Sequence, residues 1–170
     1  MRWTSWVLQL PPGRTVPDRP LPPGHAVRAA REDEREAAWT VVEDAFLEWS
    51  VRERQSFEDF AATVWQRPGF EPWHLRVVTD ADGDVVAVAS LHVNEEWAYV
   101  DKLATRADRR HRGLAQALLA DCFAVGREHG APRAELSTDS RTGALDLYLK
   151  VGMETTSVWV NRAADLTRTD

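Results

Sequence analysis

One stretch, Asp101 to Leu119 (DKLATRADRRHRGLAQALL), constrains the fold of this chain more than any other. An alternating segment, Trp97 to Thr105, predicts a strand, and a polar break separates it from an apolar helical pattern. The spacing Arg110-x-x-Gly113-x-Ala115 falls where that helix begins. Small residues let the backbone approach an anion, and free amide groups and the helix dipole favour negative charge there. The pattern fits a pyrophosphate cradle that is neither the Walker nor the GxGxxG type. Taken alone, it is also typical of a tight turn before an amphipathic helix, with the arginines exposed to solvent.

This segment resembles the coenzyme A-binding segment of the GCN5-related N-acetyltransferase (GNAT) family. The family's second mark is a helix with a tyrosine, followed by glycine and an aromatic residue. Its counterpart here is Tyr148, which leads to Gly152 and Met153, and Met153 stands where the family usually has phenylalanine. The resemblance covers roughly residues 26–160, and the pattern is nearest to actinobacterial acetyltransferases of the mycothiol synthase type. It implies that acetyl-CoA is the cofactor.

Hydrophobic periodicity predicts the order of the elements. We expect strands over residues 25–29, 75–78, 85–93, 97–105, 134–138 and 157–161, and helices over 38–49, 56–66, 112–128 and 143–151. Antiparallel hairpins come first and a β-α-β-α-β order follows. This order predicts an α/β (α+β) fold, a mixed central sheet with helices on both faces. The resemblance implies that this is the GNAT fold.

The first residues differ in composition from the rest, so we divide the chain into an arm, 1–24, and a domain, 25–170. Trp3 to Leu10 predicts a short strand, and the proline-rich Pro11 to Pro23 predicts an extended linker. The arm is either the trailing strand of a preceding domain, as in tandem members of the family, or a simple N-terminal arm. Its apolar residues predict packing onto the domain's own sheet or onto a second subunit, as in a homodimer.

The composition indicates which kinds of partner and which cellular compartment to expect. The net charge of −6 argues against nonspecific nucleic-acid binding and favours a cationic partner. Cys122 is the only cysteine, which fits a reducing cytosol and predicts a cytoplasmic protein. No apolar run approaches the roughly 20 residues that span a bilayer, so we expect no membrane partner. The five histidines show no ligand spacing, and we expect no metal. Lysine is scarce beside arginine, which hints at a bacterial source with a G+C-rich genome.

Acetyl transfer to an amine requires a proton acceptor for the incoming ammonium and a proton donor for the departing thiolate. Tyr148 is the candidate donor, because a phenol donates a proton without a metal. Asp101 and Glu135 compete as the acceptor, and a water chain is a third alternative. Asp101 lies two residues before Leu103, so both side chains should share a strand face. Glu135 matches the position of the base in the ribosomal-protein N-terminal acetyltransferases.

The resemblance implies that the backbone of the strand ending at Thr105 bonds the pantetheine arm and polarises the acetyl carbonyl. Ser140 stands where the family often has asparagine beside the thioester. Trp49, Trp65 and Trp73 fall in the region that the family places over its acceptor cleft. The full set of residues expected to bind the cofactor is Leu103, Ala104, Thr105, Arg110, His111, Arg112, Gly113, Leu114, Ala115, Ser140, Ala144 and Tyr148.

The sequence therefore predicts an acetyl-CoA-dependent N-acetyltransferase that modifies a primary amine of a small molecule by direct attack in a ternary complex. Two alternatives remain open: a protein or peptide N-terminal acetyltransferase, and a noncatalytic acyl-CoA-binding sensor module. Five acidic residues on or near the cofactor-side strands favour a cationic amine over an acidic peptide. They are Glu95, Glu96, Asp101, Glu135 and Asp139.

Overall fold

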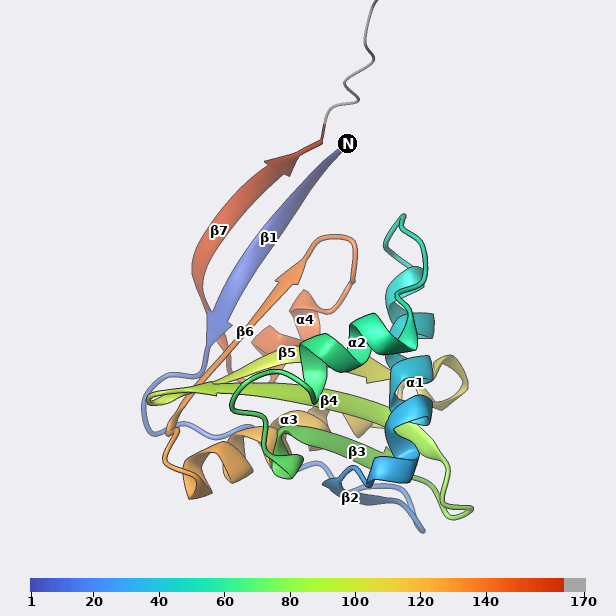
Figure 1. Cartoon of the computed structure of the whole chain (residues 1–170). Coiled ribbons are helices and arrows are strands. Elements are labelled where there is room, and N and C mark those ends of the chain that lie inside the picture. Colours follow the sequence, from blue (N-terminus) through green and yellow to red (C-terminus); the bar gives the residue numbers. More distant parts are fainter. Residues whose placement is uncertain (164–170) are drawn as a thin grey trace, which may run out of the picture.

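The computed structural model describes residues 1–163, which form a seven-stranded sheet with helices on both faces (Figure 1). The strands are β1 (Arg2–Gln9), β2 (Ala26–Ala29), β3 (Leu75–Thr79), β4 (Val85–Asn94), β5 (Trp97–Thr105), β6 (Arg133–Asp139) and β7 (Glu154–Arg162). The α-helices are α1 (Arg35–Leu47), α2 (Phe57–Val64), α3 (Leu114–Glu128) and α4 (Leu145–Lys150). In this part of the chain, no helix has the length and apolar character needed to cross a membrane.

The sheet has the order β2-β3-β4-β5-β6-β1-β7. Strands β2 to β5 form an antiparallel meander, β5 and β6 are parallel, and β1 pairs antiparallel with both β6 and β7. Side chains along each strand point alternately to the two faces of the sheet, so the core has two parts, one on each face. Val77 and Val88 pack with α1 and α2 on one face, whereas Val78 and Ala89 pack with α3 on the other. The predicted mixed sheet of the α+β class, with helices on both faces, is confirmed.

The N-terminal strand lies inside the sheet (Figure 1). On one side, Ser5 to Gln9 of β1 pairs with β6; on the other, the whole of β1 pairs with β7. Leu8 is completely buried, and the amino group of Met1 donates to the carbonyl of Ala163 at 2.8 Å. The arm thus packs onto the domain's own sheet, the first of the two arrangements expected. Because β1 offers a long partner, β7 extends beyond the predicted 157–161.

Local chemistry sets the helix ends. The hydroxyl of Ser56 accepts from the amide of Asp59 at 3.1 Å and starts α2, as its N-cap position predicts. The helix α3 starts at Leu114, two residues later than predicted. The cause is left-handed backbone just before it, with φ of +62° at His111 and +81° at Gly113. The left-handed backbone at His111 and Gly113 is incompatible with a helix, so α3 begins only after Gly113.

A β-bulge interrupts β5 at Asp101. Ser90 of β4 pairs with Lys102, and Leu91 pairs with Val100, so Asp101 is the extra residue. As a result, Val100 and Leu103 both pack into the core on the α3 face, although they are three residues apart. The expectation that Asp101 and Leu103 share a strand face is therefore wrong, because simple alternation does not survive a bulge.

Candidate active site

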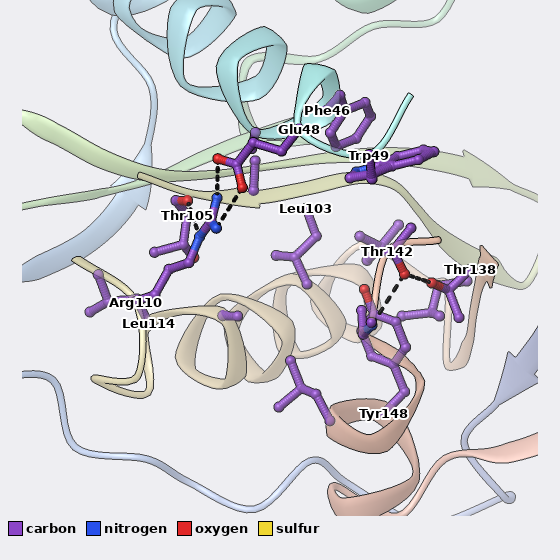
Figure 2. Close-up of a pocket in the computed structure, with 18 of the residues that line it drawn as sticks. Phe46, Glu48, Trp49, Leu103, Thr105, Arg110, Leu114, Thr138, Thr142 and Tyr148 are labelled. Atoms are coloured by element: carbon purple, nitrogen blue, oxygen red, sulfur yellow. Dashed lines mark hydrogen bonds and ion pairs between the residues drawn. The ribbon is translucent and has the colours of Figure 1, made fainter. Parts of the chain in front are cut away.

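A cavity of about 650 Å³ opens where β5 and β6 separate (Figure 2). The parallel pairing runs from Trp97 with Arg133 to Val100 with Leu136 and stops there within the described chain. Beyond that point, residues of β5 and β6 line opposite sides of the cavity. The end of α1, the start of α3, and Leu147 and Tyr148 of α4 complete the wall. The second half of β5 is bonded to β4 on one side and faces the cavity on the other.

The predicted cradle forms one end of the cavity (Figure 2). Five of its six residues line the wall: Arg110, His111, Gly113, Leu114 and Ala115. Arg112 is exposed and lies outside the lining. Gly113 occupies the N-cap position of α3, whose first amide groups have no carbonyl partner within the helix. This end of the cavity is therefore suited to an anion.

Arginine side chains around the cradle are engaged in ion pairs. Both terminal nitrogens of Arg110 donate to Glu48 at 2.7 Å, and its Nε donates to the carbonyl of Thr105 at 3.3 Å. Arg109 donates to Asp80 at 2.9 Å. The pair with Arg110 holds the pKa of Glu48 below its usual value. Because Glu48 follows the last residue of α1, this pair joins α1 to the cradle.

Tyr148 lies at the other end of the cavity, beside Thr138 and Thr142 (Figure 2). Its ring is buried, and burial raises the pKa of its hydroxyl to about 12. The hydroxyls of Thr138 and Thr142 lie 2.7 Å apart, and that of Thr142 accepts from the amide of Ala144 at 3.1 Å. Thr142 thereby fixes the start of α4, the helix that carries Tyr148. Tyr148 remains a protonated phenol throughout the physiological pH range.

Asp101 lines the cavity and has a close cationic partner. The Nζ of Lys102 donates to its Oδ2 at 2.6 Å. The Nε2 of His92 lies 3.6 Å from the same oxygen. Burial, and next the charge of Arg67, lower the pKa of His92, so its ring is neutral at pH 7. Lys102, and not His92, therefore balances the Asp101 carboxylate.

Glu135 is absent from the residues that line the cavity. Its Oε2 accepts from the side-chain amide of Gln9 at 2.6 Å, a contact between β6 and β1. Ser140 also lies outside the lining, and its hydroxyl accepts from the amide of Thr4 at 3.2 Å. Both side chains are thus engaged with the N-terminal strand.

Of the five acidic residues taken to favour a cationic acceptor, only Asp101 and Asp139 line the cavity. The exposed Glu95 and Glu96 sit in the turn between β4 and β5. Asp139 accepts from Arg141 at 3.0 and 2.6 Å. The negative charge in the cavity wall is therefore smaller than the sequence indicates.

Aromatic side chains from the end of α1 cover the cavity opposite Tyr148 (Figure 2). Phe46 and Trp49 line it, with ring centroids 5.5 Å apart. Of the three tryptophans expected over the acceptor cleft, Trp49 is the one that contributes. Trp65 packs on Phe57 and Phe60, and Trp73 stacks on His129 with centroids 3.9 Å apart.

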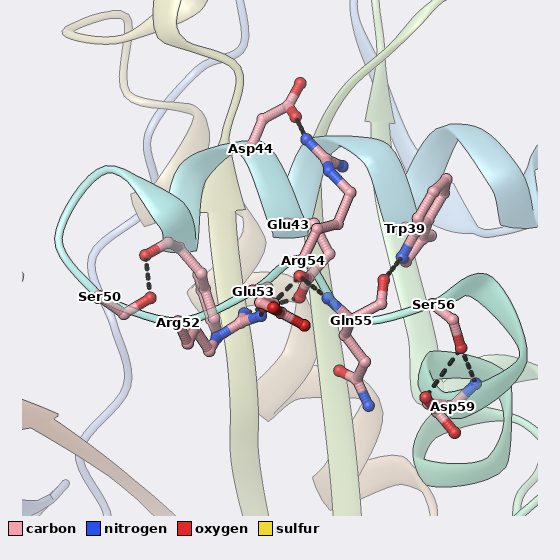
Figure 3. A network of polar contacts seen from close by, with 11 residues as sticks. Trp39, Glu43, Asp44, Ser50, Arg52, Glu53, Arg54, Gln55, Ser56 and Asp59 are labelled. Carbon is pink, nitrogen blue, oxygen red and sulfur yellow. Dashed lines mark hydrogen bonds and ion pairs between the residues drawn. The ribbon is translucent and has the colours of Figure 1, made fainter.

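A buried carboxylate fixes the loop that carries Trp49 (Figure 3). Glu43 of α1 is 1% exposed and accepts from Arg52 at 2.8 Å with both oxygens. It also accepts from the amide of Gln55 at 2.8 Å. Trp39 donates from its ring to the carbonyl of Gln55 at 3.0 Å. These bonds tie the segment between α1 and α2 to the face of α1.

Several residues that line the cavity have no signal in the sequence that predicts a function. Phe46 belongs to the apolar stripe of α1, which signals burial but no function. Glu48, Thr138 and Thr142 also line the cavity, and none of them belongs to a sequence motif. Ser5 reaches the lining because β1 is inserted in the sheet, which no local pattern indicates. Among residues 1–163, no three or more His, Cys, Asp or Glu side chains are grouped so that they could hold a metal ion.

A split mixed sheet, with an anion-binding helix start at one end of the split and a buried tyrosine at the other, is the arrangement expected of a GNAT-type protein. The model of the Acetyltransferase (GNAT) family matches residues 26–153. The chain therefore belongs to the GNAT family, which confirms the resemblance seen in its motifs.

Individual relatives agree with this assignment. A mycothiol acetyltransferase from Clavibacter sepedonicus is 29% identical over 145 residues, which cover 83% of this chain and 46% of that protein. The crystal structure of a GCN5-related N-acetyltransferase from Sphaerobacter thermophilus superposes with a TM-score of 0.77 at 26% identity, over 93% of this chain and 50% of that one. A GCN5-related N-acetyltransferase from Kribbella flavida shares the fold, with a TM-score of 0.61, 23% identity, and 92% and 56% coverage. The chain spans about half the length of these relatives.

Proposed function

We propose that this chain is an acetyl-CoA-dependent N-acetyltransferase that modifies a primary amine of a small molecule by direct attack in a ternary complex. The observation that carries the proposal is a single cavity of about 650 Å³ with the cradle at one end and Tyr148 at the other, and with Asp101 in its wall. The relative named mycothiol acetyltransferase supports acetyl transfer as the chemistry.

The cavity fits an elongated cofactor that carries phosphates. The amides at the start of α3 and the side chain of Arg110 bind the diphosphate. Leu103, Ala104 and Thr105 pair with β4 on one side, and within residues 1–163 no strand pairs with their other side. Their backbone groups on that side bond the pantetheine arm and the acetyl carbonyl, as an oxyanion hole does.

Two residues of the cavity wall, Asp101 and Tyr148, carry out the proton transfers in this proposal. Asp101 accepts the proton of the incoming ammonium, directly or through one water, which frees the nitrogen lone pair. The amine then forms its bond to the carbonyl carbon, and the bond from that carbon to sulfur breaks. Tyr148 donates its proton to the departing thiolate, and its raised pKa keeps it in the required form. As the amide forms, the nitrogen loses its second proton, which passes through water to the Tyr148 phenolate and restores the phenol, while Asp101 returns its proton to solvent. Glu135 is second to Asp101 as the base, since Gln9 holds it outside the cavity lining.

The acceptor binds between Trp49 and Tyr148 in this proposal. Each carboxylate of the wall has a basic partner: Glu48 has Arg110, Asp101 has Lys102, and Asp139 has Arg141. The attraction of the wall for a cationic amine is therefore partly offset, and the aromatic cover from α1 supplies apolar contact.

Release of coenzyme A from acetyl-CoA, measured with a panel of amines, tests the proposal. The panel contains small monoamines, polyamines, amino sugars and peptides with free N-termini. Turnover that is fastest with a small amine is the expected result. Turnover only with peptides would assign the chain to protein N-terminal acetylation. Tight binding of acetyl-CoA without turnover of any amine would favour the sensor module, and absence of binding would refute the proposal.

A further inference from the structure

The segment from Leu10 to Pro23, which joins β1 to β2, runs past the start of α3; we refer to it as the strap. Val16 is 5% exposed and belongs to the core on the α3 face. The side-chain amide of Gln116, on the first turn of α3, donates to the carbonyl of Pro17 at 2.9 Å. These contacts fix the course of the strap beside the helix start, and its prolines limit the conformations available to it.

Arg19 of the strap lies directly against Gly113. A Cβ atom placed on Gly113 would lie 2.6 Å from both Cγ and Nε of Arg19 and 3.1 Å from its Cδ. The side chain of Arg19 therefore occupies the space that any other residue at position 113 would fill. Because Gly113 lines the cavity and starts α3, this packing holds a guanidinium at the edge of the cradle.

The arginines near the start of α3 differ in whether they form ion pairs. Arg106, Arg109 and Arg110 form ion pairs with Asp108, Asp80 and Glu48. Within residues 1–163, Arg19 forms no ion pair with a carboxylate, and neither does Arg112, the exposed residue of the cradle. A ligand that recruits Arg110 must compete with Glu48, whereas a ligand that recruits Arg19 breaks no ion pair.

We infer that Arg19 binds a phosphate group of coenzyme A, so that the strap supplies a cofactor contact from outside the family's cradle motif. The inference rests on the proposed function. A guanidinium fork matches the geometry of a phosphate and stays charged at every working pH. Coenzyme A offers two phosphate groups at this end, the diphosphate and the 3′-phosphate of the ribose. The packing against Gly113 places the exposed Arg19 beside the cradle, just outside the residues that line the cavity.

Calorimetric titration of coenzyme A and of dephospho-coenzyme A, which lacks the 3′-phosphate, tests the inference. Arg19→Gln should bind coenzyme A about tenfold more weakly than the wild type. The matched control is Arg14→Gln, which removes the same charge from an exposed position of the same strap and should stay within twofold. Both variants should keep the wild-type melting temperature, because both side chains are exposed.

The two ligands separate the two phosphates. If Arg19→Gln weakens coenzyme A alone, Arg19 binds the 3′-phosphate; if it weakens both equally, Arg19 binds the diphosphate. Equal affinities of wild type and Arg19→Gln for both ligands would overturn the inference and leave the proposed function intact. Equal losses in Arg19→Gln and Arg14→Gln would also overturn it, because they would show a general charge effect. A wild type that binds neither ligand would refute the proposed function itself.

Discussion

Arg110 and Glu48 form a two-pronged ion pair in the cavity wall, with each terminal guanidinium nitrogen 2.7 Å from a carboxylate oxygen. One partner belongs to the cradle and the other follows α1, so the pair competes with the diphosphate for the same guanidinium. We predict that Glu48→Gln binds acetyl-CoA two- to fivefold more tightly, because a partly exposed pair is worth up to about 1 kcal/mol. Isothermal calorimetry checks this. Glu36→Gln, an exposed residue of α1, is the control. Weaker binding would show instead that Glu48 orients Arg110 for the cofactor.

The chain has two tyrosines, which allow a matched test of the proton donor. Tyr148→Phe keeps the buried ring and removes the hydroxyl, so kcat should fall about 10²-fold with little change in cofactor affinity. The same change at Tyr99, which lies outside the cavity lining, should leave kcat within threefold. Because the pKa of Tyr148 is raised to about 12, wild-type activity should show no loss from this group below about pH 11. Steady-state rates across pH settle both points, and an unchanged kcat in Tyr148→Phe would remove its role.

Two adjacent ion pairs on α1 allow the effect of burial to be measured. Glu43 is buried and accepts three hydrogen bonds, whereas the neighbouring Asp44 pairs with Arg54 in an exposed position. Glu43→Gln should lower the free energy of unfolding by about 2–4 kcal/mol, since it removes the buried anion that accepts from Arg52 and Gln55. Asp44→Asn should change it by less than about 0.5 kcal/mol. Urea denaturation measures both.

The pH dependence of Glu43 has a definite sign. The bonds from Arg52 and Gln55 outweigh burial and hold the pKa of this carboxyl below its usual 4.5. A lowered pKa means that the native state favours the ionised form, so the contribution is complete above about pH 5. It decreases as pH falls below 4.5 towards the lower, folded pKa. The stability difference between wild type and Glu43→Gln should therefore shrink in acid, and a constant difference from pH 7 to pH 3 would contradict this account.

Insertion of β1 between β6 and β7 predicts unequal costs for two leucines. Leu8 is 0% exposed and Leu149 is 45% exposed. Leu8→Ala should cost about 2–5 kcal/mol, the range for large-to-small changes in a core. Leu149→Ala should cost less than about 1 kcal/mol, because most of the removed surface already faces water. Equal costs would mean that β1 contributes little to the stability of the sheet.

The sequence predicts the element order well, and it finds residues that lie together at one end of the cavity, because both depend on local patterns. Arg110, Gly113 and Ala115 are close in the chain, and a periodic helix follows them directly. The insertion of β1 depends instead on a partner more than a hundred residues away, as the pairing of Leu8 with Leu136 shows. The bulge at Asp101 is equally hidden, because it depends on the register of β5 against β4. The role expected of Ser140 comes from its position in a family pattern, whereas its partner in the structure, Thr4, lies on the inserted strand.

The two candidate bases differ in their access to the reacting amine, which gives a test of the proton acceptor. Asp101 lines the cavity, whereas Glu135 accepts from Gln9 outside the lining. Asp101→Asn should lower activity most at neutral pH, where a free amine of pKa about 10 is mostly protonated. Activity should recover in part near pH 9 to 10, because solvent then removes the proton. Glu135→Gln, the matched control, should keep a wild-type pH profile.

The outcomes of this comparison are distinct. If Glu135→Gln loses activity at neutral pH and Asp101→Asn does not, the two carboxylates exchange roles, and the contact of Glu135 with Gln9 must open during turnover. If both variants keep the wild-type profile, neither carboxylate is the base and the proton leaves through water. A loss in Asp101→Asn that does not recover at high pH would mean that the carboxylate positions Lys102 or the acceptor rather than taking the proton. The shape of the pH profile, and not the size of the loss at one pH, therefore identifies the base.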